Sequence, residues 1–261
     1  MEKLTIDMNV FEKKKQNDQA LLVINEIVDE FHRLIPSGPP IGFKPIRLIN
    51  DLQAGPTFYW PLGKDFYKIG LNVSGLHYNQ IAFQFSQELS RIYCDPRINN
   101  WLIELLCHVS ALYSLGFLAN KWEDQPPQKE LEDYWYDFDS YKSNLLGAAF
   151  SKVDMVKYQV SNEWVEYQVN KLRKKDRLNR GKLLIIAYEL LPMFKEYPES
   201  WKMLPYVGKC SVPPPPDDPK SLVTKRDTKP DFEKLINMLP DELNTFADKF
   251  FTKIGAKNYI Q

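Results

Sequence analysis

A long apolar stretch at residues 99–119 constrains the fold of this 261-residue chain more than any other feature. Its apolar side chains recur on nearly every side of a helix: Leu102, Leu105, Leu106, Val109, Leu112, Leu115 and Leu118. A helix that is apolar all round is buried in a core. The sequence therefore predicts a globular domain built around this helix. Glu104 and His108 are exceptions, spaced i, i+4 on the side of Trp101, where they can face a common pocket.

The preceding helical stretch, around residues 81–93, carries a charged pair within an apolar stripe. Ile81, Phe85, Leu89 and Ile92 share one face, and Glu88 falls within it, with Gln87 and Arg91 on the flank. Glu88 is therefore expected to be at least partly buried. Because a buried carboxylate needs either a cation or a proton, Arg91, three residues on, is the predicted partner.

Residues 87–91, Gln-Glu-Leu-Ser-Arg, occupy the frame of a His-Glu-x-x-His zinc motif, and Trp101-Leu102-Ile103-Glu104 follows in the next helix. Together they resemble the glutamate-zincins, the peptidases related to thermolysin and the aminopeptidases. The resemblance covers about residues 40–122 and extends to a group of bacterial zincin-like proteins. Gln84-Phe85-Ser86 before the frame and Ser110-Ala111-Leu112 after it also fit that group's pattern.

The resemblance assigns a general base to Glu88 and a third zinc ligand to Glu104, but both ligand histidines are replaced. Gln87 offers a neutral amide, a poor zinc donor, and Arg91 offers a cation without a lone pair. His108 stands where thermolysin-like enzymes place a supporting carboxylate. The sequence thus predicts no metal, no cofactor and loss of the hydrolase activity.

We hypothesise from this pattern that the guanidinium of Arg91 replaces the positive charge of the metal, pairing with Glu104, Glu88 or both. One alternative is that Glu88, Arg91, Glu104 and His108 form a hydrogen-bonded polar cluster that has no relation to a former metal site. Another is a different metal set made of Glu88, Glu104 and His108, with His77 as a further ligand. His77, ahead of the frame helix, favours an exposed or capping role.

The N-terminal part shows the order helix, small sheet, frame helix that the resemblance implies. Residues 19–34 have helical apolar spacing, and His32 near their end is assigned no chemistry. Short β-prone pieces follow at residues 43–49, 57–60 and 66–73. The predicted fold class is α+β, zincin-like, with a small N-terminal β-sheet, the motif helix and a mainly helical C-terminal lobe. Lobes of roughly 1–95 and 96–210 form one domain.

Beyond the core helix, residues 122–141 are acidic and aromatic, and Tyr134, Trp135, Tyr136 and Phe138 form either a packed segment or an exposed binding surface. Residues 142–200 are predicted helical. A proline-rich linker is predicted at 211–230, including Pro213 to Pro216, and a helical segment at 231–261. Its helices, 231–239 and 241–253, either dock on the body or engage a partner. An interrupted basic run favours a solvated helix end: Lys171, Arg173, Lys174, Lys175, Arg177, Arg180 and Lys182.

Composition excludes several classes of protein. With 34 basic and 34 acidic residues, the chain has no electrostatic feature of a nucleic-acid or membrane-surface protein. Its N-terminus lacks the apolar core of a signal peptide, and nowhere do as many as 18 apolar residues run together. Cys94, Cys107 and Cys210 are widely spaced, as expected for free thiols in a reducing compartment. A cytoplasmic location is predicted.

These features predict a catalytically inactive zincin-like protein that acts as a scaffold or binds a protein or peptide in the cleft between its lobes. One alternative is an active hydrolase that uses Glu88 as general base with a non-standard metal site or without metal. A second is a structural subunit of a larger complex, contacting its partners through the C-terminal helices or the 134–138 aromatic cluster. The oligomeric state is left open.

Overall fold

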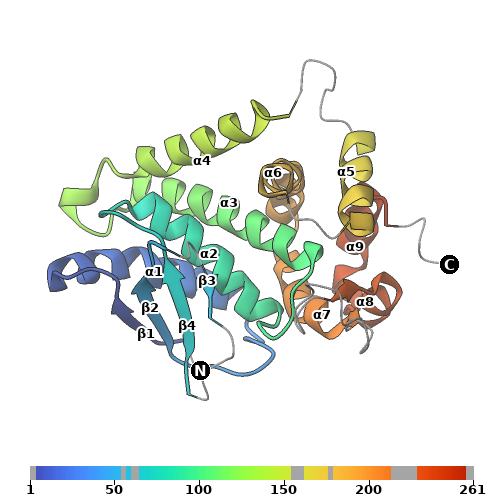
Figure 1. Ribbon diagram of the computed structural model, residues 1–261, viewed down its shortest axis with the longest axis horizontal. Coiled ribbons are helices and arrows are strands. Elements are labelled where there is room, and N and C mark those ends of the chain that lie inside the picture. The colour runs from blue at the N-terminus through green and yellow to red at the C-terminus, as the bar shows by residue number, and fades with distance from the viewer. Residues whose placement is uncertain are drawn as a thin grey trace. The chain divides into compact units, whose positions relative to one another are not determined.

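The protein has an α+β fold in which a small sheet near the N-terminus is followed almost entirely by helices (Figure 1). The computed structural model describes residues 4–53, 57–59, 65–153, 162–175, 179–212 and 228–256. The predicted fold class is confirmed at this level. Two compact units are present: Met1–Ile92 with Ser110–Leu145, and Tyr93–Val109 with Leu146–Gln261. The frame helix and the core helix each have residues in both units.

The sheet of the first unit has four strands in the order β1-β2-β4-β3. Strands β1 (Ile6–Asn9), β2 (Ile46–Asn50) and β4 (Tyr67–Leu71) are parallel, and β3 (Thr57–Phe58) pairs antiparallel with β4. One face is apolar and buried, whereas Arg47 and Lys68 project from the other. The three predicted β-prone pieces correspond to β2, β3 and β4. Strand β1 was not predicted, and Trp60 lies outside the described residues.

Helix α1 (Lys14–Leu34) connects β1 to β2 and begins five residues before the predicted start at Gln19. Its first residues are polar, so apolar periodicity gives no indication of that turn. The rest of the helix behaves as predicted, because its apolar stripe is buried: Ala20, Val23, Ile24, Ile27, Val28, Phe31 and Leu34. His32 is half-buried beside the ring of Phe43, with ring centroids 6.0 Å apart.

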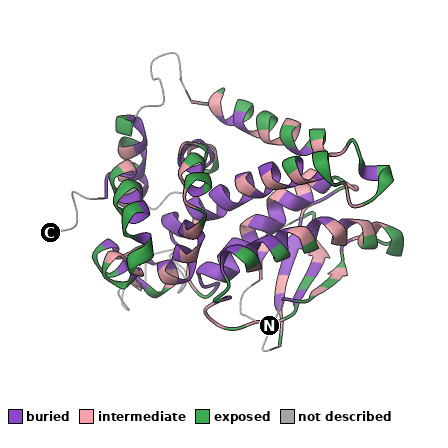
Figure 2. Ribbon diagram, turned by 180° about the vertical axis from the view of Figure 1, so that it is seen from behind, coloured by how far each residue is buried: buried purple, intermediate pink, exposed green. Residues whose placement is uncertain are grey.

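The two helices that carry the predicted site residues are α2 (Tyr78–Cys94) and α3 (Trp101–Asp124). Helix α3 is the predicted core helix, and buried residues run along its whole length (Figure 2). Its length and hydropathy would suffice to cross a membrane, but 83% of its apolar window is buried inside the protein. The core helix of a globular domain passes the same test.

The rest of the described chain is helical except for a two-stranded sheet. The remaining elements are η1 (Lys129–Leu131), α4 (Trp135–Phe150), α5 (Asn162–Lys175), α6 (Arg180–Glu196), η2 (Pro198–Met203), α7 (Leu204–Lys209), β5 (Ser211–Val212), β6 (Lys229–Pro230), α8 (Phe232–Met238), η3 (Asp241–Leu243) and α9 (Asn244–Lys253). Strands β5 and β6 pair antiparallel. The predicted Pro213 to Pro216 linker lies outside the described residues, as does Arg177 of the basic run.

The second unit is held together by aromatic side chains from its last helices. Phe194 of α6 lies 4.7 Å from Trp201 and 5.1 Å from Phe246 between ring centroids, and Phe250 is fully buried beside them. Each such ring buries a large apolar area. Helix α9 therefore packs on α6 within the second unit, and contact of these helices with a partner stays a prediction.

Candidate functional site

Glu88 and Arg91 form a buried ion pair on α2. Arg91 Nε donates to Glu88 Oε2 at 3.0 Å. The side chain of Arg91 is only 10% exposed and that of Glu88 only 6%. Their i, i+3 spacing places both on one side of the helix. The predicted burial of Glu88 and its pairing with Arg91 are confirmed. Gln87, which occupies the position of the other replaced histidine, is half-buried.

Because Arg91 pairs with Glu88, residues 87–91 are poorly suited to bind a metal ion or to accept a proton. A guanidinium cannot coordinate a cation and stays protonated at any physiological pH. It also engages the carboxylate that would have to accept a proton from a metal-bound water. Glu88 and Arg91 are therefore arranged as a structural ion pair. Among the described residues, no group of three or more His, Cys, Asp or Glu side chains could hold a metal ion.

Glu104 and His108 lie on the first turns of α3, in the second unit. His108 is buried, with Nδ1 2.8 Å from the carbonyl oxygen of Glu104. A carbonyl can only accept, so Nδ1 carries the proton in this contact. This contact involves the backbone of Glu104, whose side chain is half-buried, and the common pocket expected for the two side chains stays a prediction. The ion pair between Arg91 and Glu104 stays a prediction, because the two residues belong to different units.

Two polar contacts that the sequence did not predict fix α2 within the first unit. Gln84 on α2 accepts from the backbone N–H of Asn72 at 2.8 Å and donates to the carbonyl of the same residue at 2.9 Å. Ser110 of α3 donates to Ser90 of α2 at 2.9 Å, and both serines are fully buried. Buried polar groups paired in this way hold their helices in one register. From the sequence, Gln84 is expected only as part of the pattern that resembles the zincin-like group.

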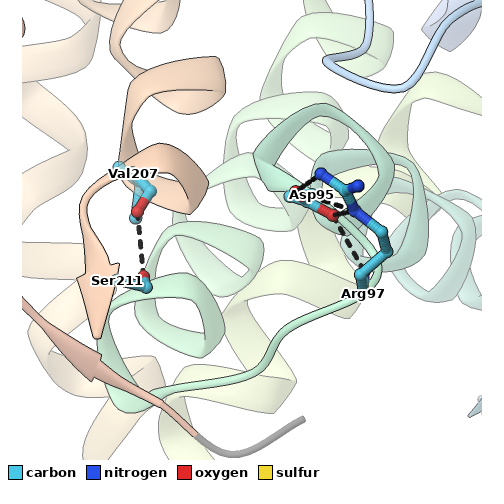
Figure 3. A network of polar contacts seen from close by, with 4 residues as sticks. All are labelled: Asp95, Arg97, Val207 and Ser211. Atoms are coloured by element: carbon cyan, nitrogen blue, oxygen red, sulfur yellow. Dashed lines mark hydrogen bonds and ion pairs between the residues drawn. The ribbon is translucent and has the colours of Figure 1, made fainter. Parts of the chain in front are cut away.

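The connection between α2 and α3 is a constrained turn in the second unit. Asp95 has a positive φ of 123°, which is rare for a residue other than glycine. Its carboxylate accepts from Arg97 Nη2 at 2.6 Å and from Arg97 Nε at 2.8 Å (Figure 3). Gly208 packs so tightly on this turn that a Cβ atom there would overlap the carbonyl oxygen of Cys94.

Asn100 forms the N-cap of α3 and joins it to residues at the β5–β6 sheet. Its Oδ1 accepts from the backbone N–H groups of Leu102 and Ile103, each at 3.0 Å. Its Nδ2 donates to Ser211 Oγ at 3.0 Å and to Thr228 Oγ1 at 3.1 Å. Ser211 in turn donates to the carbonyl of Val207 (Figure 3). The cap provided by Asn100 thus fixes the start of α3, whose first turn contains Trp101 and Glu104.

His77 and the 134–138 aromatic cluster take no part in the polar contacts described above. His77 is exposed, and its carbonyl accepts the N–H of Ile81 at the start of α2, in agreement with its predicted exposed or capping role. In the 134–138 cluster, Tyr134 and Phe138 pack on Trp122, with ring centroids 6.3 Å and 5.1 Å away. Only Tyr136 is largely exposed, at 64%. Most of the cluster is therefore packing, and Tyr136 alone presents a large exposed ring.

The search against protein-family models, curated proteins and solved structures found no match for this chain.

Proposed function

We propose that this chain is a zincin-like protein that has lost its metal site and acts by binding or as a scaffold rather than by hydrolysis. The order of its elements supports this. Helix α1 is followed by β2, β3 and β4 and then by the frame helix α2, and Trp101 and Glu104 follow on α3. This order is the one that the resemblance to the glutamate-zincins implies, and the proposal rests on that resemblance.

One observation carries the proposal: the buried ion pair of Arg91 with Glu88. In the zinc motif these two positions hold a ligand and the general base. Here they hold a fixed positive charge and its counter-ion. At an effective dielectric constant of about 20 and a separation of about 4 Å, a guanidinium and a divalent cation repel by about 8 kcal/mol. That repulsion opposes metal binding at the frame, and Arg91 offers no lone pair in exchange.

The cysteines support an intracellular setting for the proposed protein. Cys94, Cys107 and Cys210 are all buried and form no disulfide, as expected of cysteines in a reducing compartment. Within this proposal the location is the cytoplasm.

The test restores the missing ligands. Gln87→His with Arg91→His recreates a His-Glu-x-x-His frame, and we expect this double variant to bind about one zinc per chain in equilibrium dialysis, with Glu104 as third ligand. Adding Glu104→Gln should then weaken zinc binding at least tenfold, since an amide is a poor zinc donor. The unaltered protein should bind none at the same zinc concentration.

The matched control is the single variant Gln87→His, which adds one imidazole while the cation remains. It should bind no more zinc than the unaltered chain. A double variant that folds, as judged by its near-ultraviolet circular dichroism, but gains no zinc would contradict the zincin-like assignment. Zinc binding by the unaltered protein would instead contradict the proposed loss of the site.

A further inference from the structure

Helix α4 begins with an exposed aromatic pair, Trp135 and Tyr136, in the first unit. Tyr136 is 64% exposed, the largest fraction among the large apolar side chains of the described residues, and Trp135 is half-buried. Their ring centroids lie 6.0 Å apart, and the ring planes stand at 86° to each other. Aromatic rings are usually buried in the core, and those at the surface are enriched at interfaces. The aromatic pair therefore has the features of a contact surface.

The backbone beneath the aromatic pair is held by the packed part of the 134–138 cluster. Between ring centroids, Tyr134 lies 4.8 Å from Tyr78 of α2, and Phe138 lies 5.1 Å from Trp122 of α3. These contacts anchor the residues on both sides of the pair. The two rings are thus presented on a firmly packed helix start, and a preformed surface of this kind reduces the ordering cost of binding.

The surface around the aromatic pair is acidic. Exposed carboxylates surround it in sequence, at Glu130, Glu132, Asp133, Asp137 and Asp139, whereas residues 129–142 contain only two lysines, Lys129 and Lys142. Lys142 already pairs with Asp139 at 2.7 Å. At the end of α3, which packs on this segment through Trp122, Glu123 and Asp124 are also exposed. The carboxylates therefore outnumber the lysines that could neutralise them.

The polarity of the helix accounts for only a small part of this negative charge. The N-terminus of a helix is equivalent to about half a positive elementary charge. Asp137 is the acidic residue in the first turn of α4, and this one carboxylate is enough to balance that end. The other carboxylates repel one another, and a cationic group that arrives from outside relieves the repulsion.

The combination of rings and carboxylates favours arginine over other cations. Asp133 precedes Tyr136 by three residues and Asp139 follows it by three, a spacing at which helical residues are neighbours. A cation within about 6 Å of a ring centroid is attracted to the ring face. A planar guanidinium can stack on a ring and still donate sideways to a carboxylate, whereas the compact ammonium of lysine lacks that fork of donors.

We propose that the aromatic pair and its surrounding carboxylates bind an arginine-containing, basic segment of a partner protein. One guanidinium stacks on the ring of Tyr136 and donates to a neighbouring carboxylate. Further basic residues of the segment lie against the remaining carboxylates. The proposal does not rest on the resemblance to the zincins, so its failure would leave the zinc-binding test of the double variant unaffected.

Fluorescence anisotropy with a designed probe tests the proposal. The probe is a fluorescein-labelled peptide of glycine and serine that carries three spaced arginines. We expect saturable binding that weakens as the sodium chloride concentration rises. A matched peptide with lysine in place of arginine should bind about three- to fivefold more weakly. A peptide with citrulline, which keeps the shape of arginine without its charge, should lose binding.

Variants at the aromatic pair separate ring stacking from simple charge attraction. Tyr136→Ala should weaken probe binding about two- to fivefold, the change that corresponds to loss of an exposed cation–π contact, whereas Tyr136→Phe keeps the ring and should bind normally. The matched control is Tyr188→Ala, at an exposed tyrosine of the second unit, which should leave binding unchanged. Thermal melting checks that each variant is folded.

Charge variants test the carboxylates in both directions. Asp133→Asn should weaken binding about two- to threefold, while Glu233→Gln, at an exposed carboxylate of the second unit, should not change it. Lys129→Glu removes a competing cation and should strengthen binding about twofold. A gain of affinity is informative because a variant that merely fails to fold cannot produce it.

The indole N–H resonance of Trp135 in a nuclear magnetic resonance spectrum gives a direct readout of the site. Assigned by its loss in Trp135→Phe, it should shift with the arginine peptide and stay in place with the citrulline peptide. Absence of saturable binding, equal binding of the lysine peptide, or unchanged binding by Tyr136→Ala would overturn the proposal. Self-association of the chain that blocks the probe would assign the surface to a second copy and would also overturn it.

Discussion

Replacing Arg91 by leucine is expected to destabilise the protein by about 3–5 kcal/mol, because it removes the cation that pairs with the buried carboxylate of Glu88. The magnitude follows from the structure. The two side chains are 10% and 6% exposed and joined by a hydrogen bond of 3.0 Å, so solvent cannot replace the lost partner. An exposed ion pair contributes only about 0–1 kcal/mol. Glu88→Leu should also destabilise the protein, because it removes the carboxylate that accepts from Arg91 Nε.

A double-mutant cycle separates the pair from its surroundings. The double variant with leucine at both positions removes both charges, and it should be more stable than either single variant by at least 2 kcal/mol, on the order of the penalty for a stranded charge. Urea unfolding monitored by circular dichroism gives the free energies. As a matched control, Lys142 and Asp139 form an ion pair with the same i, i+3 spacing but with Asp139 54% exposed. Asp139→Leu should change stability by less than about 1 kcal/mol.

The reasoning fails if Arg91→Leu changes the free energy of unfolding by no more than the Asp139→Leu control does. It also fails if the effects of Glu88→Leu and Arg91→Leu simply add, because independent contributions would mean that the two charges do not stabilise each other.

Three further predictions concern other polar groups. Glu104→Ala should destabilise the protein by about 3–5 kcal/mol if its carboxylate is a second partner of Arg91, and an unchanged melting temperature would reject that role. Asn100→Ala should cost about 1–3 kcal/mol through loss of the α3 cap and of the bonds to Ser211 and Thr228, while Asn100→Asp should retain the cap and recover part of the loss in the same urea titration. Burial opposes the ionisation of Glu30, but hydrogen bonds from Arg33 and Tyr113 outweigh it and hold the pKa of Glu30 below its ordinary value of 4.5. This carboxylate therefore contributes stability above about pH 4.5 that is lost as the pH falls through the lowered folded pKa, and Glu30→Gln should flatten that part of a plot of stability against pH.

Local features of the fold could be predicted from the sequence because they depend on spacing alone. The apolar helix that became α3, the β-prone pieces that became β2 to β4, and the i, i+3 pair of Glu88 and Arg91 are all of this kind. Strand β1 was missed, although Ile6 and Met8 alternate with Asp7 and Asn9 as expected of a short strand. The start of α1 at Lys14 was missed because its first turn is polar.

Contacts between distant segments could not be predicted from one sequence. Asn100 reaches Ser211 and Thr228, which are 111 and 128 residues away. Ser90 and Ser110 are ordinary helix residues until α2 and α3 bring their hydroxyls together. The aromatic side of the C-terminal helices was predictable, but its target, the Phe194 and Trp201 cluster, depends on tertiary structure.

The most direct test of the central claim is the metal content of the unaltered protein, measured by elemental mass spectrometry after purification without a chelating tag. It is measured before and after incubation with excess zinc followed by dialysis. If Arg91 has replaced the metal, a stably folded sample contains no stoichiometric zinc in either state. Zinc that stays bound at about one ion per chain would contradict the claim and would make Glu88, Glu104 and His108 the ligands to test.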